Sequence, residues 1–150
     1  MSWGPARQGR VSLLPAGAVA LALALTGCVG SPGPHDYDLV DAAAKQLQIS
    51  HVGTVGYVNH YGQRHRVSGN GPSVEFFIAT DDASAAQTIV NTAVGSGWDG
   101  SGGQAASTTV DGHYLQLSIV PYSANDRADM GDGKSHSWSQ SGLIVDIAES

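Results

Sequence analysis

Residues 73–98 read SVEFFIATDDASAAQTIVNTAVGSGW, and their pattern sets the fold class of the chain. The first seven residues, 73–79, are largely apolar on both alternating faces, which is typical of a strand in the middle of a sheet. Over residues 82–94, apolar side chains recur every three or four positions and predict a helix with one buried stripe. Asp82 can cap the first turn of that helix, and Gly95 can end it in a left-handed conformation. A central strand followed at once by an amphipathic helix indicates a layered α+β domain.

The chain after this stretch has the pattern of an antiparallel hairpin and one further strand. Asp111-Gly112 favours a two-residue turn, because both residues tolerate the positive φ that such a turn needs. The turn joins predicted strands at 108–110 and 113–120, and the second of these alternates apolar and polar side chains. A last alternating strand is predicted over 142–148, with its odd-numbered residues facing inward.

Residues 122–141 separate the last two predicted strands and show no apolar periodicity. Within this stretch, residues 123–140 offer mainly Ala128, Met130 and Trp138 for burial. That apolar surface is too small to offset the entropy lost when the stretch becomes ordered. We therefore expect a long mobile loop that is dispensable for folding.

The chain before the central strand supplies a second helix and an edge of the sheet. Apolar residues at helical spacing predict a helix within 37–48. Residues 52–58 are rich in valine and threonine and predict a strand, in which Gly53 and Gly56 indicate a bulge or a close backbone neighbour. A second short strand is expected at 66–67.

These elements together predict one α+β domain over residues 37–150. We expect a two-layer sandwich, in which two helices cover one face of a mostly antiparallel sheet. The strand–helix–strand–strand run over 73–120 resembles part of a ferredoxin-like split unit, a resemblance that carries no function. The composition agrees, because 150 residues with 41% hydrophobic and 13% charged side chains suit a single globular domain with an appendage.

The charge of the chain excludes some classes of partner. The formal net charge is −6, and Arg7 and Arg10 lie in an N-terminal segment that we expect to be removed. Nucleic-acid binders gain affinity when Lys and Arg displace counterions from phosphates, and this chain has no basic patch for that purpose. We therefore expect no nucleic-acid partner, and for the same reason no polybasic contact with a membrane.

The N-terminus has the layout of an export signal. Residues 1–10 hold two arginines and no acid, and residues 11–25 are almost wholly apolar. This apolar run is shorter and more interrupted than a membrane-spanning helix requires. It ends in Leu25-Thr26-Gly27-Cys28, which resembles the lipobox of bacterial lipoproteins. Because Cys28 is the only cysteine in the chain, no intramolecular disulfide can form.

The resemblance implies that signal peptidase recognises the three residues before Cys28 and cleaves there. The thiol of Cys28 would carry a diacylglyceryl group as a thioether, and its new amino group could carry a further acyl chain. Residues 1–27 would then be a signal peptide and 28–36 a flexible tether. The domain would be anchored on the extracytoplasmic face of a membrane, with no other cofactor. The alternative is an ordinary secretory signal cleaved near Ala22 or Ala24.

The histidines are the candidate metal ligands. His60 and His65 flank a predicted turn, and with His51 or His113 they could converge on zinc or copper from adjacent strands. Their spacing matches no defined motif. Histidines solvated at turns are the simpler interpretation.

The sequence contains no motif of a known catalytic class. It lacks a Gly-x-Ser-x-Gly elbow, and its glycine-rich stretches 95–97 and 100–103 lack the lysine of a phosphate-binding loop. The favoured interpretation is a lipid-anchored extracytoplasmic envelope protein with a binding or structural role rather than an enzyme. Its protein or small-molecule ligand is not specified by the sequence. The alternative is a small metal-binding or hydrolytic lipoprotein that uses its histidines.

Overall fold

The computed structural model describes residues 36–62, 71–100 and 102–150. The predicted signal peptide, the lipobox-like motif with Cys28, His65 and the short strand expected after it lie outside the described residues. Within the described part of the chain, no helix is both long enough and apolar enough to cross a membrane.

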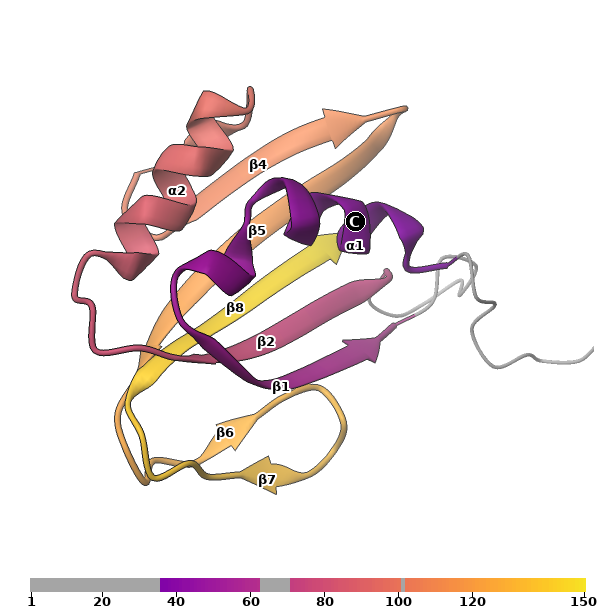
Figure 1. Ribbon diagram of the computed structural model, residues 1–150. Helices are drawn as coiled ribbons and strands as arrows, with labels where there is room; N and C mark the ends of the chain where they lie inside the picture. Colours follow the sequence, from indigo (N-terminus) through magenta and orange to yellow (C-terminus); the bar gives the residue numbers. More distant parts are fainter. Residues whose placement is uncertain (1–35, 63–70, 101) are drawn as a thin grey trace, which may run out of the picture. The chain divides into compact units, whose positions relative to one another are not determined.

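The described residues form two α-helices, a six-stranded antiparallel sheet and a separate two-stranded ribbon (Figure 1). The predicted α+β class is therefore confirmed. In chain order the elements are α1 (Asp38–Gln46), the short 3₁₀ helix η1 (Ile49–His51), β1 (Thr54–Tyr61), β2 (Ser73–Ala79), α2 (Ala85–Gly95), β3 (Asp99–Gly100), β4 (Ala105–Val110), β5 (His113–Tyr122), β6 (Ala128–Asp129), β7 (Ser135–His136) and β8 (Gly142–Glu149).

The last strand of the chain lies inside the sheet. The strand order is β1-β2-β8-β5-β4-β3, and each neighbouring pair runs antiparallel. Ile147 of β8 lies opposite Val74 of β2 on one side and opposite Leu117 of β5 on the other. β2 and β5 therefore run parallel to each other, separated by β8. The sheet shares this feature, two parallel strands with a third strand inserted between them, with the ferredoxin-like split unit.

Both helices pack on the same face of the sheet, and this side holds the larger core (Figure 1). Helix α1 contributes Val40 and Ala43, and helix α2 contributes Ile89 and Ala93, all buried. Alternate residues of the central strands face these helices, as the odd-numbered pattern of the last strand predicts. The strand residues in this core are Val74, Ile78, Ala106, Leu115, Leu117, Ile119, Leu143, Val145 and Ile147.

Helix α2 has the predicted stripe but different ends. It begins at Ala85, because Asp82 forms a turn before the helix: its Oδ1 accepts hydrogen bonds from the backbone N–H of Ser84 at 2.8 Å and from the Ser84 hydroxyl at 2.7 Å. The prediction that Gly95 takes the left-handed conformation was wrong. Gly95 is the last helical residue, the final turn continues past it, and Gly97 has the positive φ of 90°.

Strand β1 confirms the predicted bulge and the close backbone neighbour. The register of β1 against β2 shifts at Gly56. A Cβ on Gly56 would lie 2.9 Å from the ring of Phe77, and a Cβ on Gly53 would lie 2.5 Å from the carbonyl oxygen of Ala79. Gly56 in β1 and Gly53 directly before it therefore need glycine, because the chain passes too close to β2 for a side chain at either position.

Residues 123–141, which we call the cover segment, pack on the sheet face opposite the helices and contain the ribbon β6–β7. Trp138 stacks on Phe77, with ring centroids 4.0 Å and planes 8° apart, and Met130 is fully buried. The prediction of a long mobile loop over residues 122–141 is therefore wrong. The few large apolar side chains of the cover segment suffice because the sheet presents a matching second apolar surface that includes Phe77 and Tyr122.

Candidate functional site

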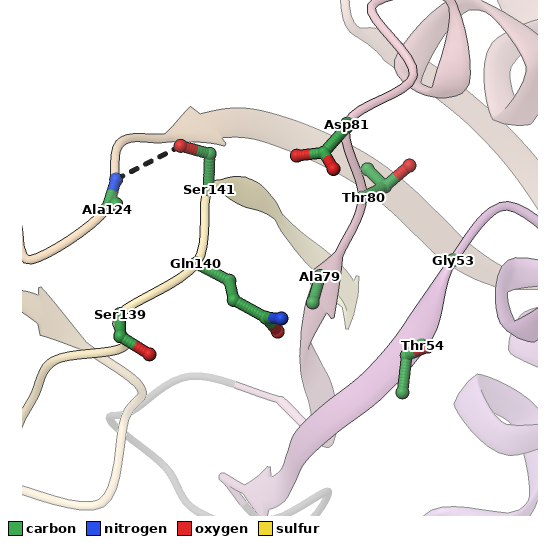
Figure 2. A pocket seen from close by; sticks show the side chains of 9 residues that line it. All are labelled: Gly53, Thr54, Ala79, Thr80, Asp81, Ala124, Ser139, Gln140 and Ser141. Atoms are coloured by element: carbon green, nitrogen blue, oxygen red, sulfur yellow. Dashed lines mark hydrogen bonds between the residues drawn. The ribbon is translucent and has the colours of Figure 1, made fainter.

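A pocket of about 560 Å³ opens where β1 begins and β2 ends, against both ends of the cover segment (Figure 2). We call it the end pocket. Four separate stretches of the chain form its walls, so it exists only in the folded domain. The residues that line it are Gly53, Thr54, Ala79, Thr80, Asp81, Ala124, Ser139, Gln140 and Ser141.

The nine described residues that line the end pocket are mainly polar, and one of them is charged. In Figure 2 the Asp81 carboxylate, the Gln140 amide and the Ser139 hydroxyl point toward the open space between the walls. The carboxylate only accepts hydrogen bonds, whereas the amide and the hydroxyl both donate and accept. None of the nine lining residues is basic. This set of groups suits a polar ligand that bears hydroxyl, amide or amine groups, and it disfavours an anion.

Hydrogen bonds hold the two ends of the cover segment beside the end of β2. The Ala124 N–H donates to Ser141 Oγ at 3.2 Å, which is the dashed line in Figure 2. The Thr80 N–H donates to the Ser141 carbonyl at 3.3 Å, and the Asn125 N–H donates to the Trp138 carbonyl at 2.7 Å. Ser141 therefore links the wall formed by the cover segment to the wall formed by the end of β2.

Tyr122, the last residue of β5, stabilises the wall that the cover segment forms, through contacts in the smaller core. Its hydroxyl accepts a hydrogen bond from the Trp138 N–H at 2.9 Å and donates to the Asp126 carbonyl at 2.5 Å. Its ring meets Phe77 and Trp138 edge-on, at centroid distances of 5.2 and 5.3 Å. One buried side chain thus joins the start of the cover segment to its end.

A polar cluster lies between the cover segment and β1. Asp132 Oδ2 accepts a hydrogen bond from the Tyr57 hydroxyl at 2.9 Å and lies 2.9 Å from His136 Nε2, while Oδ1 accepts from the Lys134 N–H at 2.9 Å. Burial opposes ionisation of Asp132. The hydrogen bonds from Lys134, His136 and Tyr57 and the imidazole charge outweigh burial and lower the pKa of Asp132 to about 2. The loop that carries Asp132 is thereby tied to the sheet through a carboxylate.

A second carboxyl cluster lies on the same face of the sheet. Glu75 of β2 and Asp146 of β8 are opposite each other in register, and the Tyr61 hydroxyl donates to Asp146 Oδ1 at 3.1 Å. Burial, followed by the negative charges of Asp146, Asp129 and Asp132, raises the pKa of Glu75 to about 7. Burial also raises the pKa of Asp146, although its hydrogen bond from Tyr61 opposes this rise. Glu75 therefore titrates near neutral pH.

The histidines of the described ranges do not converge on one site. His60 Nε2 lies 2.7 Å from Asp41 Oδ1, beside α1, and His113 Nδ1 lies 2.8 Å from Glu149 Oε1, at the end of the sheet. His65, the other candidate ligand, lies outside the described residues. Within those residues, no group of three His, Cys, Asp or Glu side chains could hold a metal ion. The described part of the chain thus gives the metal-site hypothesis no support.

Sequence reasoning missed the end pocket for an identifiable reason. In the sequence, Asp81 directly precedes Asp82 at the expected helix start, and Ser139, Gln140 and Ser141 belong to the stretch 122–141 that is predicted to be a loop. The available signal was Trp138, a large apolar side chain directly before these polar residues. No family model, curated protein or solved structure matches this chain, so the site is interpreted from its own geometry.

Proposed function

We propose that this chain is a lipid-anchored extracytoplasmic binding module and that the end pocket is its ligand site. The observation that carries the proposal is a polar pocket of about 560 Å³ with a wall fixed by hydrogen bonds. Small-molecule sites are usually preformed clefts of this size, mostly apolar with a few placed polar groups, so the end pocket matches them in size but has a more polar lining. Ordered loops on a rigid scaffold, such as the cover segment, are where binding residues tend to collect.

The ligand class that fits best is a small hydroxyl-bearing compound, neutral or with an amine, such as an amino sugar. Asp81 is the only charged residue among the described lining residues, and an ammonium group would make a charge-assisted hydrogen bond to it. The Gln140 amide and the Ser139 hydroxyl can serve as donor and acceptor for sugar hydroxyls. A phosphate would meet a carboxylate, no basic side chain from the described part of the lining, and a chain of net charge −6.

Titration of the full chain with three probes tests this proposal. Glucosamine and glucose should shift the NMR signals of Asp81 and Gln140, and glucose 6-phosphate should shift them least, because the carboxylate repels the phosphate. Asp81→Asn should weaken glucosamine binding about fivefold, because one partly exposed charge pair contributes about that factor to an affinity. It should leave glucose binding unchanged.

Asp99→Asn is the matched control, because Asp99 is an exposed carboxylate that does not line the end pocket. It should leave the response to all three probes unchanged. If none of the probes shifts the pocket signals, or if Asp99→Asn weakens glucosamine binding as much as Asp81→Asn does, the proposed ligand class is wrong.

The membrane anchor is a separate part of the proposal and rests on Leu25-Thr26-Gly27-Cys28. Intact-mass measurement of the membrane-extracted protein should find an acylated Cys28 at the N-terminus. Cys28→Ser should abolish lipidation, because a hydroxyl cannot replace the thiolate in forming the thioether. An unmodified N-terminus upstream or downstream of Cys28 would exclude the lipoprotein assignment.

A further inference from the structure

The middle of the cover segment lies over a carboxyl group of the sheet. The Met130 carbonyl accepts a hydrogen bond from Asn59 Nδ2 at 2.8 Å. Gly131 packs so closely on Tyr61 that a Cβ there would lie 2.5 Å from the ring. Asn59 is the register partner of Glu75 on the neighbouring strand β2, and Glu75 is only 9% exposed. The closed cover segment therefore helps to keep Glu75 away from water.

Among the described residues, the charged groups that act most on Glu75 are carboxyl groups from two directions. Asp146 lies directly opposite on β8, within the sheet. Asp129 and Asp132 belong to the cover segment, and both act electrostatically on Glu75. A negative charge on Glu75 would thus repel groups on both sides of the interface between the sheet and the cover segment.

Three further titratable groups belong to this cluster. His136 Nε2 lies 2.9 Å from Asp132 Oδ2. The Tyr57 hydroxyl also donates a hydrogen bond to Asp132, and the Tyr61 hydroxyl donates one to Asp146. The two cations of the cover segment, Arg127 and Lys134, are exposed. Solvent therefore screens them more than it screens the buried Glu75 and the partly buried Asp132 and Asp146, whereas Asp129 is exposed and is screened as they are.

We propose that ionisation of Glu75 loosens the cover segment, so that pH controls the shape of the end pocket. This inference rests on the function proposed above, because it concerns the regulation of the same site. The connection is structural: Trp138, which holds the cover segment on the sheet, directly precedes the lining residues 139–141. When the segment opens, one wall of the end pocket loses its support.

The direction of the pH effect follows from the two states of Glu75. In the closed protein, burial and the neighbouring carboxylates raise its pKa from 4.5 to about 7, and an open segment returns the pKa toward its ordinary value. Closure therefore has its full stability below about pH 4.5 and loses it as the pH rises through about 7. Asp132 stays ionised over this range, because its pKa is lowered to about 2.

Hydrogen exchange of the full chain in detergent tests the inference without any ligand. After correction for intrinsic rates, amides in 128–138 should be on the order of tenfold less protected at pH 8 than at pH 6. Glu75→Gln cannot ionise and should remove this difference. Glu149→Gln is the matched control, since Glu149 is the other glutamate of the chain, is also buried and pairs with His113 instead. It should keep the tenfold difference.

Asp146→Asn provides a second test that keeps Glu75 in place. It removes one repelling charge, so it should reduce the pH difference in 128–138. Equal protection at pH 6 and pH 8 in the wild-type chain would overturn the inference, as would an unchanged difference in Glu75→Gln. Because no probe sugar is present, such a result would count against pH control alone, and the binding proposal is decided by its own titration.

Discussion

At the scale of single residues, the hydroxyl of Tyr122 makes a testable contribution to the cover segment. It bonds to the Trp138 N–H and to the Asp126 carbonyl at a position where the tyrosine is 5% exposed. Tyr122→Phe keeps the ring but leaves the Trp138 N–H without this acceptor. We expect a loss of about 1–3 kcal/mol in the free energy of unfolding, measured with urea, because an unpaired buried polar group has that cost.

Tyr114→Phe is the control for this prediction. Tyr114 lies on the same strand but is 44% exposed. Its hydroxyl can exchange hydrogen bonds with water, so the substitution should change the stability by less than about 0.5 kcal/mol. Equal losses in the two variants would mean that the Tyr122 hydroxyl bonds contribute nothing specific.

At the scale of elements, the corrected end of α2 gives a matched pair of substitutions. Apart from adjacent residues and nearby helix backbone, neither Gly95 nor Gly97 has a heavy atom within 4 Å of the position a Cβ would take, so the two differ mainly in backbone conformation. Gly95→Ala should stabilise the domain by about 0.5–1 kcal/mol, because alanine is the better helix former. Gly97→Ala should destabilise it by about 1–2 kcal/mol, because φ is 90° there. Thermal or urea unfolding measures both stability changes. If Gly95→Ala destabilised the domain and Gly97→Ala stabilised it, Gly95 rather than Gly97 would be the left-handed residue.

The elements also show which parts of the fold a sequence pattern can predict. The strand over 73–79 and the turn at Asp111-Gly112 have the predicted bounds, because an apolar run and a positive-φ pair are local signals. Strand β4 begins at Ala105, three residues earlier than predicted. Residues 105–107 are small or polar and show no alternation, and they become a strand because they pair with β5 and bury Ala106. That pairing is a tertiary effect and leaves no local signal.

The candidate site was less predictable than the fold for the same physical reason. The wall of the end pocket depends on the contact of Trp138 with Phe77, two residues far apart in the sequence. The cover segment contains few apolar residues, as its composition shows. They are ordered because the second face of the sheet offers them an apolar surface that includes Ile144 and the buried ring of Tyr122. Whether such a segment orders is decided by the partner surface as well as by the segment.

At the scale of the whole molecule, the sheet separates two cores of unequal size. The larger core lies under the helices, and Leu117 in it is fully buried. Leu117→Ala should lower the free energy of unfolding by about 2–5 kcal/mol, because it removes buried atoms and leaves a cavity. Phe76 faces the same side but is only partly buried, so Phe76→Ala should cost less. Urea unfolding measures both, and an unchanged Leu117→Ala variant would mean that the assignment of the sheet faces is wrong.

The smaller core predicts how the domain responds when the cover segment is removed. Replacement of residues 125–139 by a short Gly/Ser tether removes Met130 and Trp138 and exposes Phe77. The changed loop length alone has a small effect, about 0.6 kcal/mol for each doubling. The loss of a well-packed aromatic alone is worth about 3–5 kcal/mol, so we expect a total loss of at least about 3 kcal/mol in urea unfolding. The far-UV circular dichroism of the helices should persist, because α1 and α2 pack on the other core.

A loss below about 1 kcal/mol would mean that the cover segment is held only by its ends, as a loop without anchors would be. A loss of all helical signal would mean that the two cores form one cooperative unit, in which the cover segment could not open by itself.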